Sequence, residues 1–304
     1  SVHGKARIEE INTDRIRHLL NEGHVVIVAG FQGVTEAGEI TTLGRGGSDT
    51  TAVALAAALK ADLCEIYTDV TGVFTTDPRV VPSARKLPVV SHDEMLEMAI
   101  LGAGVLHPRS VEVAKLNGVN LVVRSSFTDE EGTLIQEGSD MERSLVVTGI
   151  AFEEDVVKVQ VEGLPAGSEA LARLFTLLAD ERINVDVIVQ SQRGENEINL
   201  AFSIAEEDRV KAEETLQANQ ASLGFRSVAC ESGLAKVSIV GAGMMTNPGV
   251  AAMCFQFLSD ADIPIKMVTT SEIKVSCVIP RNHMEEAVNR LHEGFGLAGN
   301  SNAS

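Results

Sequence analysis

Aromatic residues are scarce in this sequence. Among its 304 residues there is no tryptophan and a single tyrosine, Tyr67, and aromatic residues make up 4% of the chain. Surfaces that stack unpaired bases or sugars need such flat rings. The composition therefore gives no support to a base-stacking or carbohydrate-binding surface.

Cysteine is scarce as well. The four cysteines, Cys64, Cys230, Cys254 and Cys277, are scattered through apolar stretches, and no two of them have C-x-x-C spacing. A metal site or a disulfide framework would require a closer or more regular spacing. We therefore predict buried free thiols in a cytoplasmic protein, where the surroundings are reducing, and no metal site built from them.

Positive charge is in short supply. Lysine and arginine number 25 against 43 aspartate and glutamate residues, which gives a formal net charge of −18. Nucleic acids and anionic membranes attract basic patches, so we expect neither as a partner. No apolar run approaches the roughly 20 residues of a membrane-spanning helix, and no charged-then-apolar leader opens the sequence. With 44% hydrophobic residues, the chain is expected to fold into roughly two or three globular domains.

A glycine-rich loop runs directly into an alanine-rich helix. The loop is Leu43–Thr51, and residues 52–61 after it are strong helix formers. Ser48 or Asp49 would cap this helix, whose free N–H groups and dipole favour an anion. Arg45 can hold a carboxylate with two hydrogen bonds, and Asp49 can hold a cation or an ammonium group. The spacing matches neither a P-loop nor a G-x-G-x-x-G turn, and a plain connection between elements is the alternative.

A strand is predicted ahead of this loop. Val25–Ala29 is apolar on both faces, as are the strands of parallel sheets that helices cover. It follows an amphipathic helix predicted over residues 8–21, and residues 30–33 come directly after it. Open α/β sheets place their ligands at this carboxyl edge. A hairpin through residues 36–39 would then lead into the glycine-rich loop.

A second polar loop follows the next predicted strand. The strand covers residues 63–68, and the loop at 68–79 contains two acids, several hydroxyls, an aromatic residue and an arginine. This set is typical of the surroundings of a nucleotide and its metal. A polar surface loop, with Asp77 and Pro78 as a turn, is the alternative.

Helices and a strand alternate after this loop. Ser91 and Glu94 have the spacing of a capping box, so a helix is predicted to begin there. Another helix begins near His107, whose place before a proline favours a positional role over a catalytic one. Residues 121–124 form a further strand. To about residue 144 we predict an α/β three-layer sandwich.

Four motifs in this region resemble the aspartate kinases of the amino acid kinase family. They are Gly30–Gly33, Thr41–Asp49, Thr68–Arg79 and Gly102–Pro108, and the resemblance extends over nearly the whole chain. It implies transfer of a phosphoryl group from ATP, with Mg²⁺, to the side-chain carboxylate of L-aspartate. The product would be 4-phospho-L-aspartate, in the first step toward diaminopimelate and lysine, threonine and methionine.

The resemblance also implies two sets of site residues. Around L-aspartate it places Phe31, Arg45, Gly46, Gly47, Ser48 and Asp49, with Arg45 and Asp49 as the catalytic residues. Around ATP it places Thr68, Asp69, Phe74, Thr75, Asp77, Pro78, Arg79 and Gly104, with Arg79 near the phosphates and Phe74 beside the adenine. Phosphoryl transfer asks mainly for positioning and charge stabilisation, which two facing anion-binding loops would supply.

The chain departs from the family pattern at two points. Gly104 stands where many members carry a lysine, so one cation near the nucleotide is missing. The family's opening strand, Lys-Phe-Gly-Gly-Thr-Ser, and the acidic substrate residue after it have no counterpart in this sequence. The resemblance assigns that lysine to the transferred phosphoryl group. We therefore expect this polypeptide alone to have little or no kinase activity.

The second half of the chain contains an internal repeat. Val157–Gly163 aligns with Ala235–Gly241, and after a slip of two residues Phe175, Leu178 and Ile183 align with Phe255, Leu258 and Ile263. Each copy has the strand and helix order of an α+β ferredoxin-like unit. A final strand near residues 225–229 would complete the first copy, and residues 145–150 would complete the second. We therefore predict a kinase portion at 1–144, a first unit at 155–230, and a discontinuous second unit from 145–154 and 231–304.

Paired ferredoxin-like units after a kinase portion resemble ACT domains, which bind amino acids where a loop enters a helix. In the second copy the resemblance implies an effector site at Asn247, Pro248, Gly249, Val250, Ala251 and Ala252, with Lys266, Met267, Ser271 and Glu272 on the adjoining strands. In the first copy it implies Asn184, Val185, Asp186 and Gln190, although the loop at 164–169 has lost the customary Asp and Pro-Gly. Lysine is our first choice of effector and threonine our second, in a homodimer formed through these units.

The sequence allows three alternatives to these assignments, which concern residues 237–243, the ACT-like sheets and the whole chain. Residues 237–243 look like the start of a dinucleotide-binding turn, but Thr246 replaces the expected glycine, and Asp260 and Asp262 precede the next strand instead of ending it. The ACT-like sheets could be packed structural units that only dimerise. The chain could also be an amino-acid-sensing regulatory fragment without catalysis.

Overall fold

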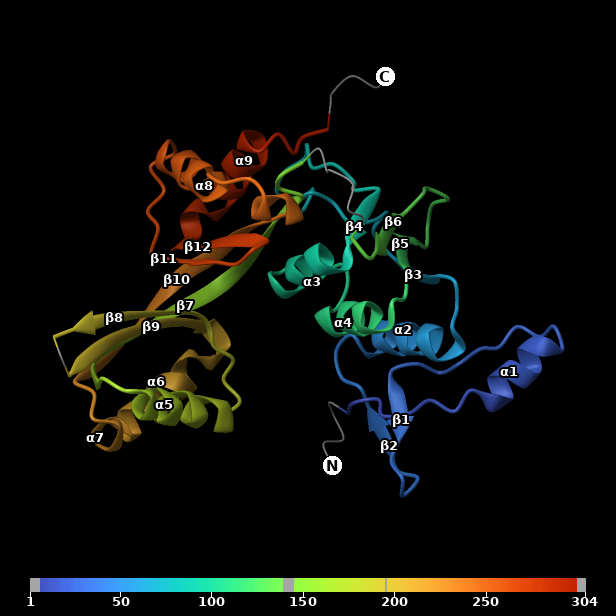
Figure 1. Ribbon diagram of the computed structural model, residues 1–304, viewed down its shortest axis with the longest axis horizontal. Coiled ribbons are helices and arrows are strands. Elements are labelled where there is room, and N and C mark those ends of the chain that lie inside the picture. The colour runs from blue at the N-terminus through green and yellow to red at the C-terminus, as the bar shows by residue number, and fades with distance from the viewer. Residues whose placement is uncertain (1–5, 139–144, 195, 300–304) are drawn as a thin grey trace. The chain divides into compact units, whose positions relative to one another are not determined.

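The computed structural model describes residues 6–138, 145–194 and 196–299 (Figure 1). The chain divides into two compact units. The first comprises residues 1–151, 240–247 and 295–304, and the second comprises residues 152–239 and 248–294.

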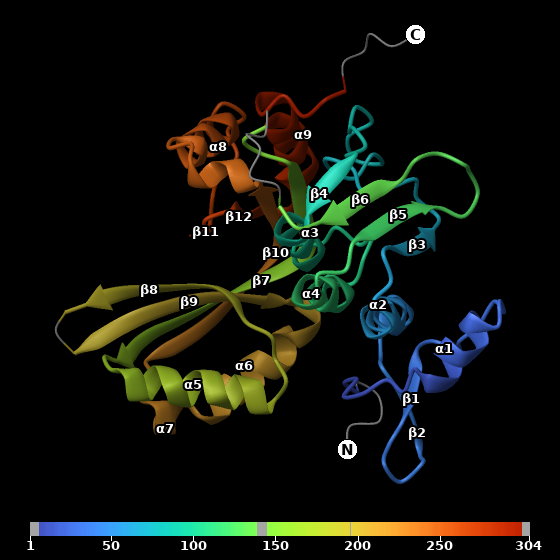
Figure 2. The ribbon, with the colours of Figure 1, turned by 45° about the vertical axis from the view of Figure 1, so that its right-hand side comes forward.

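The first unit is built on a four-stranded mixed sheet with the strand order β3-β5-β6-β4. Its elements are α1 (Asp14–Asn21), β1 (Gln32–Val34), β2 (Ile40–Thr42), α2 (Gly47–Leu59), β3 (Cys64–Thr68), β4 (Val89–Ser91), α3 (His92–Ile100), α4 (Pro108–Asn117), β5 (Leu121–Ser125), β6 (Thr133–Gln136) and a short 3-10 turn, η2 (Ala242–Met245). β5 is parallel to β3 and antiparallel to β6, which is parallel to β4. Figure 2 shows these four strands side by side, while β1 and β2 form a separate antiparallel hairpin.

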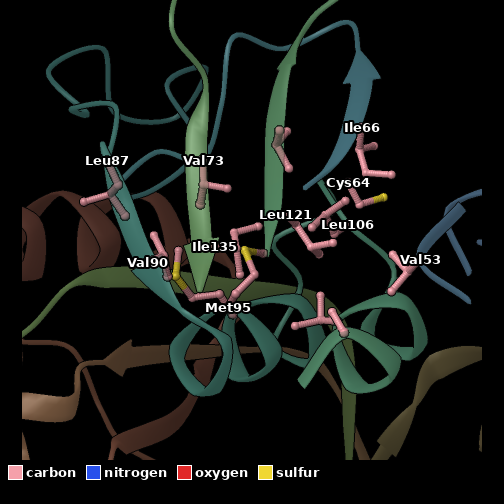
Figure 3. Close-up of a cluster of buried hydrophobic side chains, with 14 of the residues drawn as sticks. Val53, Cys64, Ile66, Val73, Leu87, Val90, Met95, Leu106, Leu121 and Ile135 are labelled. Atoms are coloured by element: carbon pink, nitrogen blue, oxygen red, sulfur yellow. The ribbon is translucent and has the colours of Figure 1, made fainter. Parts of the chain in front are cut away.

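Side chains of α2, α3 and α4 pack on this sheet to form one hydrophobic core. In Figure 3, Val53 of α2 and Met95 of α3 lie with Ile66, Leu121 and Ile135 of the sheet. The residues of β3 and β5 alternate between more and less buried positions, because successive side chains of a strand point to opposite faces. The core therefore uses every second residue of the strands, as the sequence pattern requires.

Several local predictions are confirmed. β3, β5, α2 and α4 form where the sequence predicts them. At the start of α3, the Glu94 backbone N–H donates to Ser91 Oγ at 3.2 Å, and the Ser91 N–H donates to Glu94 Oε2 at 3.2 Å, which is the predicted capping box. His107 is the N-cap of α4, in agreement with a positional role. The β1–β2 hairpin turns at residues 35–39, as expected.

The strand predicted at Val25–Ala29 is wrong. These residues form no strand, and the side chains of Val25 and Ile27 are 93% and 95% exposed. A strand needs a hydrogen-bonding neighbour, and within residues 6–138, 145–194 and 196–299 no strand pairs with this segment, since β3 is an edge of its sheet. Apolar character alone did not decide the conformation.

Two predicted helix starts also need correction. α1 begins at Asp14 instead of near residue 8, because the Asn12 side chain accepts the Asp14 N–H at 3.0 Å in a local turn. The N-cap of α2 is Gly46, not Ser48 or Asp49, which lie within the first helical turn. Gly46 has a φ of 70°, a conformation that glycine adopts without strain.

The second unit is dominated by a six-stranded sheet with the order β11-β12-β10-β7-β9-β8. Its elements are β7 (Gly149–Pro165), α5 (Ser168–Asp180), β8 (Asp186–Arg193), β9 (Glu197–Ala205), α6 (Arg209–Ala218), α7 (Gln220–Leu223), β10 (Ser227–Val240), α8 (Val250–Ser259), β11 (Met267–Thr270), β12 (Lys274–Pro280) and α9 (Met284–Gly294), with 3-10 turns η1 (Glu206–Asp208) and η3 (Arg281–His283). Figure 1 shows α5 and α6 beside β7, β8 and β9. Leu174 of α5, Leu216 of α6 and Phe202 of β9 are fully buried in their shared core.

The two copies of the repeat share their longest strands. The strand predicted near residues 225–229 begins at Ser227 and continues to Val240 as the first strand of the second copy. The Thr148 N–H donates to Val240 O at 2.7 Å, so the segment at 145–150 lies beside β10, as the sequence suggested. The boundaries of the two compact units differ from the predicted domain boundaries, because residues 145–151 and 240–247 belong to the first unit. The predicted domain boundaries therefore stay a prediction.

The repeat extends to unusual backbone positions. Arg182 and Asp262 have positive φ angles of 59° and 53°, a conformation that few residues other than glycine adopt. The isoleucine after each of them donates its N–H to a buried leucine of the preceding helix, Ile183 to Leu178 O at 2.9 Å and Ile263 to Leu258 O at 3.0 Å. The two copies thus end their first helix with the same turn.

Candidate functional site

The loop before α2 takes a shape that requires glycine. Gly44 and Gly46 have φ angles of 78° and 70°. A Cβ atom on Gly46 would overlap the Cβ and Cγ atoms of His107 and would lie 2.7 Å from its Cδ2. Gly46 accepts no substitute there, because both the backbone angle and the space exclude a side chain. The N-terminus of α2 has no side-chain cap. The Gly47 N–H donates to Gly44 O at 3.0 Å, which leaves the N–H groups of Ser48 and Asp49 available to an anion.

Phe31 is held against this loop. Its N–H donates to Thr51 Oγ1 at 3.1 Å, and its carbonyl accepts the Leu43 N–H at 2.9 Å. Its ring lies so near Gly47 that a Cβ atom there would be 2.9 Å from Phe31 Cδ2. Phe31 also has a φ of 72°, which is strained for a bulky residue and is typical of functional sites.

Asp49 lies in the first turn of α2 and is half-buried. Burial raises the pKa of its carboxyl group, and the nearby charge of His107 and a hydrogen bond with Ser48 offset part of that effect. Ser48 and Arg45 are exposed. The structure therefore brings the predicted aspartate-binding residues together at one helix N-terminus, with His107 beside them.

Arg45 and His107 line the same cavity. It measures about 1040 Å³ and lies along α2, α4 and the segment at residues 7–11. Arg109, which sequence reasoning did not single out, also lines it and donates to Leu43 O at 3.0 Å and to Ala6 O at 2.8 Å. No local signal marks Arg109, because both of these carbonyls are distant from it in sequence.

The second predicted loop forms its own cluster of charges. Thr68 Oγ1 donates to Asp69 Oδ1 at 3.0 Å after β3. The Arg79 guanidinium, whose side chain is 88% exposed, contacts Asp77 Oδ2 at 2.6 Å. This hydrogen bond holds the pKa of Asp77 below its ordinary value. Asp77 thus neutralises the arginine that the resemblance assigns to the phosphates.

The other predicted nucleotide-binding residues differ in their exposure to solvent. Phe74 is half-buried and forms a backbone bridge with Lys86, and Pro78 is exposed. Thr75 is fully buried, its hydroxyl accepting the Arg85 N–H at 3.0 Å, so its side chain faces the interior. Gly104 is exposed with open space around its α-carbon. Thr75 as a nucleotide contact stays a prediction that its burial does not favour.

In the second copy of the repeat, the predicted effector loop leads into α8. Gly249 is the N-cap of α8 with a φ of 99°, and the Asn247 amide donates to Gly243 O at 2.8 Å. Pro248 and Ala252 are exposed, Ala251 is half-buried and Val250 is buried. The N-terminus of α8 therefore has no side-chain cap, and a carboxylate at this place stays a prediction.

The adjoining strands differ from the prediction in detail. Ser271 and Glu272 lie in the turn between β11 and β12, not on a strand, because Ser271 N–H closes the turn on Lys274 O at 2.9 Å. Lys266, just before β11, pairs with Glu231 at 2.7 Å. Met267 is 5% exposed and belongs to the core. Glu272 stays exposed at the tip of the turn.

In the first copy, Asp186 is exposed and forms an ion pair with a buried lysine. Lys236 Nζ lies 2.6 Å from Asp186 Oδ2 and 2.8 Å from Glu153 Oε2, and Lys236 is 4% exposed. Burial raises the pKa of Asp186, but the hydrogen bond and charge of Lys236 outweigh it and hold the pKa below its ordinary value. Asn184 and Gln190 are exposed and Val185 is half-buried.

A cavity of about 500 Å³ touches the predicted effector strands of both copies. Its lining includes Lys266 and Met267 from the second copy, and Val189 and Ser191, which flank Gln190, from the first. It lies within the second unit. Residues from the two copies thus meet around one space.

The residues that the structure describes contain neither a metal-binding cluster nor a membrane-spanning helix. No group of three or more histidine, cysteine, aspartate or glutamate side chains within them is arranged to hold a metal ion. No helix among these residues is both long and apolar enough to cross a membrane.

Comparison with known proteins gives the same assignment along the chain. The model of the amino acid kinase family matches residues 2–125, and that of an ACT domain matches residues 159–220 and 237–295. An aspartokinase of Bacillus sp. (strain MGA3) is 58% identical over 300 residues, covering 99% of this chain and 73% of the relative.

Two solved structures of Escherichia coli aspartokinase III are also similar. One, in complex with aspartate and ADP, has a TM-score of 0.78 and 32% sequence identity, and the match covers 92% of this chain and 63% of the solved chain. The other, in complex with lysine and aspartate, has a TM-score of 0.72 and 32% identity and covers 92% and 62%. This chain therefore spans less than two thirds of the solved enzyme's length. The 58% identity to the Bacillus relative, in a match that covers 99% of this chain, shows that the chain belongs to the aspartokinases, amino acid kinases that carry ACT domains.

Proposed function

We propose that this chain carries out the aspartokinase reaction as part of a phosphotransferase. The γ-phosphoryl group of ATP would pass to the side-chain carboxylate of L-aspartate and give 4-phospho-L-aspartate. The observation that carries this proposal is the loop at Leu43–Asp49, which combines an uncapped helix N-terminus with Arg45 and Asp49. Charge and position are what phosphoryl transfer demands of a protein.

In this proposal the residues before and within α2 hold the substrate. Arg45 binds a carboxylate of L-aspartate, and Asp49 receives the ammonium group. Phe31, Gly46, Gly47 and Ser48 shape the floor of the site through backbone groups. Asp49 is half-buried with a raised pKa, and an ammonium group beside it would lower that pKa again.

ATP and Mg²⁺ would bind along the loop at residues 68–79. Mg²⁺ keeps several waters and takes one or two carboxylates together with substrate phosphates. Asp69 and Asp77 are the carboxylates of this loop that would fit that requirement. Arg79 would exchange its bond to Asp77 for one to a phosphate, since its side chain is exposed.

The fold is proposed in finer detail on the same basis. We infer that the kinase portion is a three-layer α/β sandwich over residues 1–144. The strand order β10-β7-β9-β8 supports a ferredoxin-like first ACT domain at 155–230. The strand order β7-β10-β12-β11 supports a second, discontinuous ferredoxin-like domain from 145–154 and 231–304. The last strand of each copy would be continuous with the first strand of the other copy, in β7 and in β10.

Feedback by lysine, or by threonine as second choice, is proposed at the ACT domains. The effector carboxylate would bind at the start of α8, near Asn247, and Glu272 would receive a side-chain ammonium group of lysine. The N-terminus of α8, which has no side-chain cap, supports this placement. The cavity between the two copies is lined by Lys266 and Met267 but not by Asn247 or Glu272. A cytoplasmic homodimer formed through the ACT domains is the proposed assembly.

A second candidate is an amino-acid-sensing regulatory fragment without catalysis. The observation that favours it is the exposure of Val25 and Ile27 at 93% and 95%, because these two apolar side chains of the kinase portion are left almost uncovered.

Calorimetric titration separates the two candidates. We expect L-aspartate to bind saturably in the presence of ADP and Mg²⁺, and the binding to be lost in Arg45→Ala. Arg173→Ala, at an exposed helix position of the ACT unit, is the control and should bind aspartate normally. Lysine binding without any aspartate binding would overturn the catalytic proposal and support the regulatory fragment.

A further inference from the structure

The start of α4 grips the loop before α2 at two points. Arg109 donates from its guanidinium to Leu43 O at 3.0 Å, at the beginning of the loop. His107 packs its ring and Cβ directly on the α-carbon of Gly46, at the end of the loop. Arg45 lies between these two points along the chain. The loop is therefore held on both sides of the arginine that would bind the substrate.

The contact with Gly46 fixes the direction in which α2 begins. Gly46 is the N-cap of α2 and has a left-handed backbone, which glycine leaves easily for other conformations. The ring of His107 fills the place of the missing side chain, so the turn is confined by packing. Asp49 follows three residues later, and its position depends on that turn.

His107 itself is held in place by its own helix. Its Nδ1 accepts the Arg109 N–H at 3.2 Å, so in the neutral ring Nε2 carries the proton. His107 thus packs on the turn that precedes Asp49.

Arg109 is anchored independently. It is half-buried, and besides Leu43 O it donates to Ala6 O at 2.8 Å. A guanidinium that bridges two backbone carbonyls from separate segments acts as a rigid brace, because its donors lie in one plane. Neither of these bonds is needed to cap α4, since His107 provides the cap.

We propose that His107 and Arg109 are positioning residues for aspartate binding, which hold the loop at residues 43–47 so that Arg45 and Asp49 face the substrate. This proposal rests on the proposed function of the loop. It assigns to the His-Pro-Arg sequence at the start of α4 a role in substrate affinity beyond helix capping. Neither residue contacts the reacting atoms in this role.

Two conservative variants separate positioning from capping. His107→Asn keeps a good N-cap acceptor but removes the ring from Gly46, and Arg109→Lys keeps the charge but loses the planar fork. Ser91→Ala is the matched control, because it removes the cap of the neighbouring helix α3 without touching the loop. Hydrogen exchange of the Gly47 and Thr50 amides, which donate to Gly44 O and Gly46 O at 3.0 Å each, is measured first, since it needs no ligand.

We expect both variants to accelerate exchange at Gly47 and Thr50 while leaving the amides in the middle of α4 protected. Affinity for L-aspartate should fall about tenfold, which corresponds to about 1.4 kcal/mol, with affinity for ADP unchanged. Ser91→Ala should alter neither measurement in the loop. Unchanged loop exchange in both variants would overturn the proposal and leave only a capping role.

The same experiment distinguishes this proposal from the proposed function. If the unaltered chain fails to bind aspartate, the proposed function fails, while faster loop exchange in the variants would still show the brace. If the unaltered chain binds aspartate and both variants bind it equally well, the proposed function stands and the positioning role is overturned.

Discussion

Glu94 and Thr148 are joined by a hydrogen bond of 2.6 Å between the Thr148 hydroxyl and Glu94 Oε1. Glu94 is fully buried, and the same oxygen accepts the Ala242 N–H at 3.1 Å. Its other oxygen accepts from the Ser91 hydroxyl at 2.6 Å. A buried carboxylate thus links the start of α3 to two segments that are distant in sequence. One of them, η2, continues along the chain into the proposed effector loop.

Removing this carboxylate should destabilise the first unit. We expect Glu94→Ala to lower the free energy of unfolding by about 3 kcal/mol, because several buried donors lose their acceptor. Thr148→Val, which removes one donor at constant volume, should cost about 1 kcal/mol. Urea denaturation measures both changes.

The matched control is Asp93→Asn on the same helix, whose pair with Lys115 is largely exposed and should contribute about 0.5 kcal/mol or less. Equal effects of Glu94→Ala and Asp93→Asn would contradict this account.

An alanine at Gly46 should be far more costly than one at Gly23. Both glycines have positive φ angles, but a Cβ atom on Gly46 would overlap His107, whereas Gly23 has open space around it. Gly23→Ala should cost about 1 kcal/mol for its backbone alone, and Gly46→Ala about 3 kcal/mol because steric overlap is added. Thermal unfolding of the two variants tests the difference. Similar melting temperatures would show that the contact with His107 is loose.

The buried lysine of the second unit should make stability depend on acid pH. The folded-state pKa of Asp186 is lowered, so its ion pair stabilises the fold above the unfolded-state value of about 3.9. This contribution is lost as the pH falls below that value and through the folded-state pKa. In Lys236→Met the pKa of Asp186 should rise, because burial persists and the cation is gone.

Carboxyl titration by NMR measures the pKa of Asp186 in both proteins. Lys266→Met is the control, since Lys266 pairs with Glu231 at a more exposed site and should leave Asp186 unchanged. An Asp186 pKa that does not move in Lys236→Met would refute the assigned cause.

Lysine binding should depend on the turn between β11 and β12. We expect Glu272→Gln to weaken lysine binding about tenfold, since loss of one charged hydrogen bond costs about 1.5 kcal/mol or more. Threonine has no side-chain ammonium group, so its binding should change little. Calorimetric titration with each amino acid makes the comparison, and Glu285→Gln on α9 serves as the control. Equal losses for lysine and threonine would place the effector ammonium group elsewhere.

Much of the candidate site could be read along the chain, because its signals are local. The glycine-rich loop, the alanine-rich helix after it and the capping box at Ser91 and Glu94 depend on neighbouring residues. Arg109 could not be found in this way. Its role depends on the carbonyl of Leu43, which is 66 residues away in sequence.

The sequence by itself determined the helices with strong formers and caps, the internal repeat and the glycine-rich loop before α2, since all of these are encoded within a few turns or strands. Tertiary structure decided which apolar segments became strands. Val25–Ala29 has the pattern of a buried strand but no hydrogen-bonding neighbour, while β7 and β10 each run on from one copy of the repeat into the other. Strand pairing joins residues that are far apart along the chain, so local pattern cannot determine it. The brace of His107 and Arg109 on the substrate loop depends on the same long-range packing.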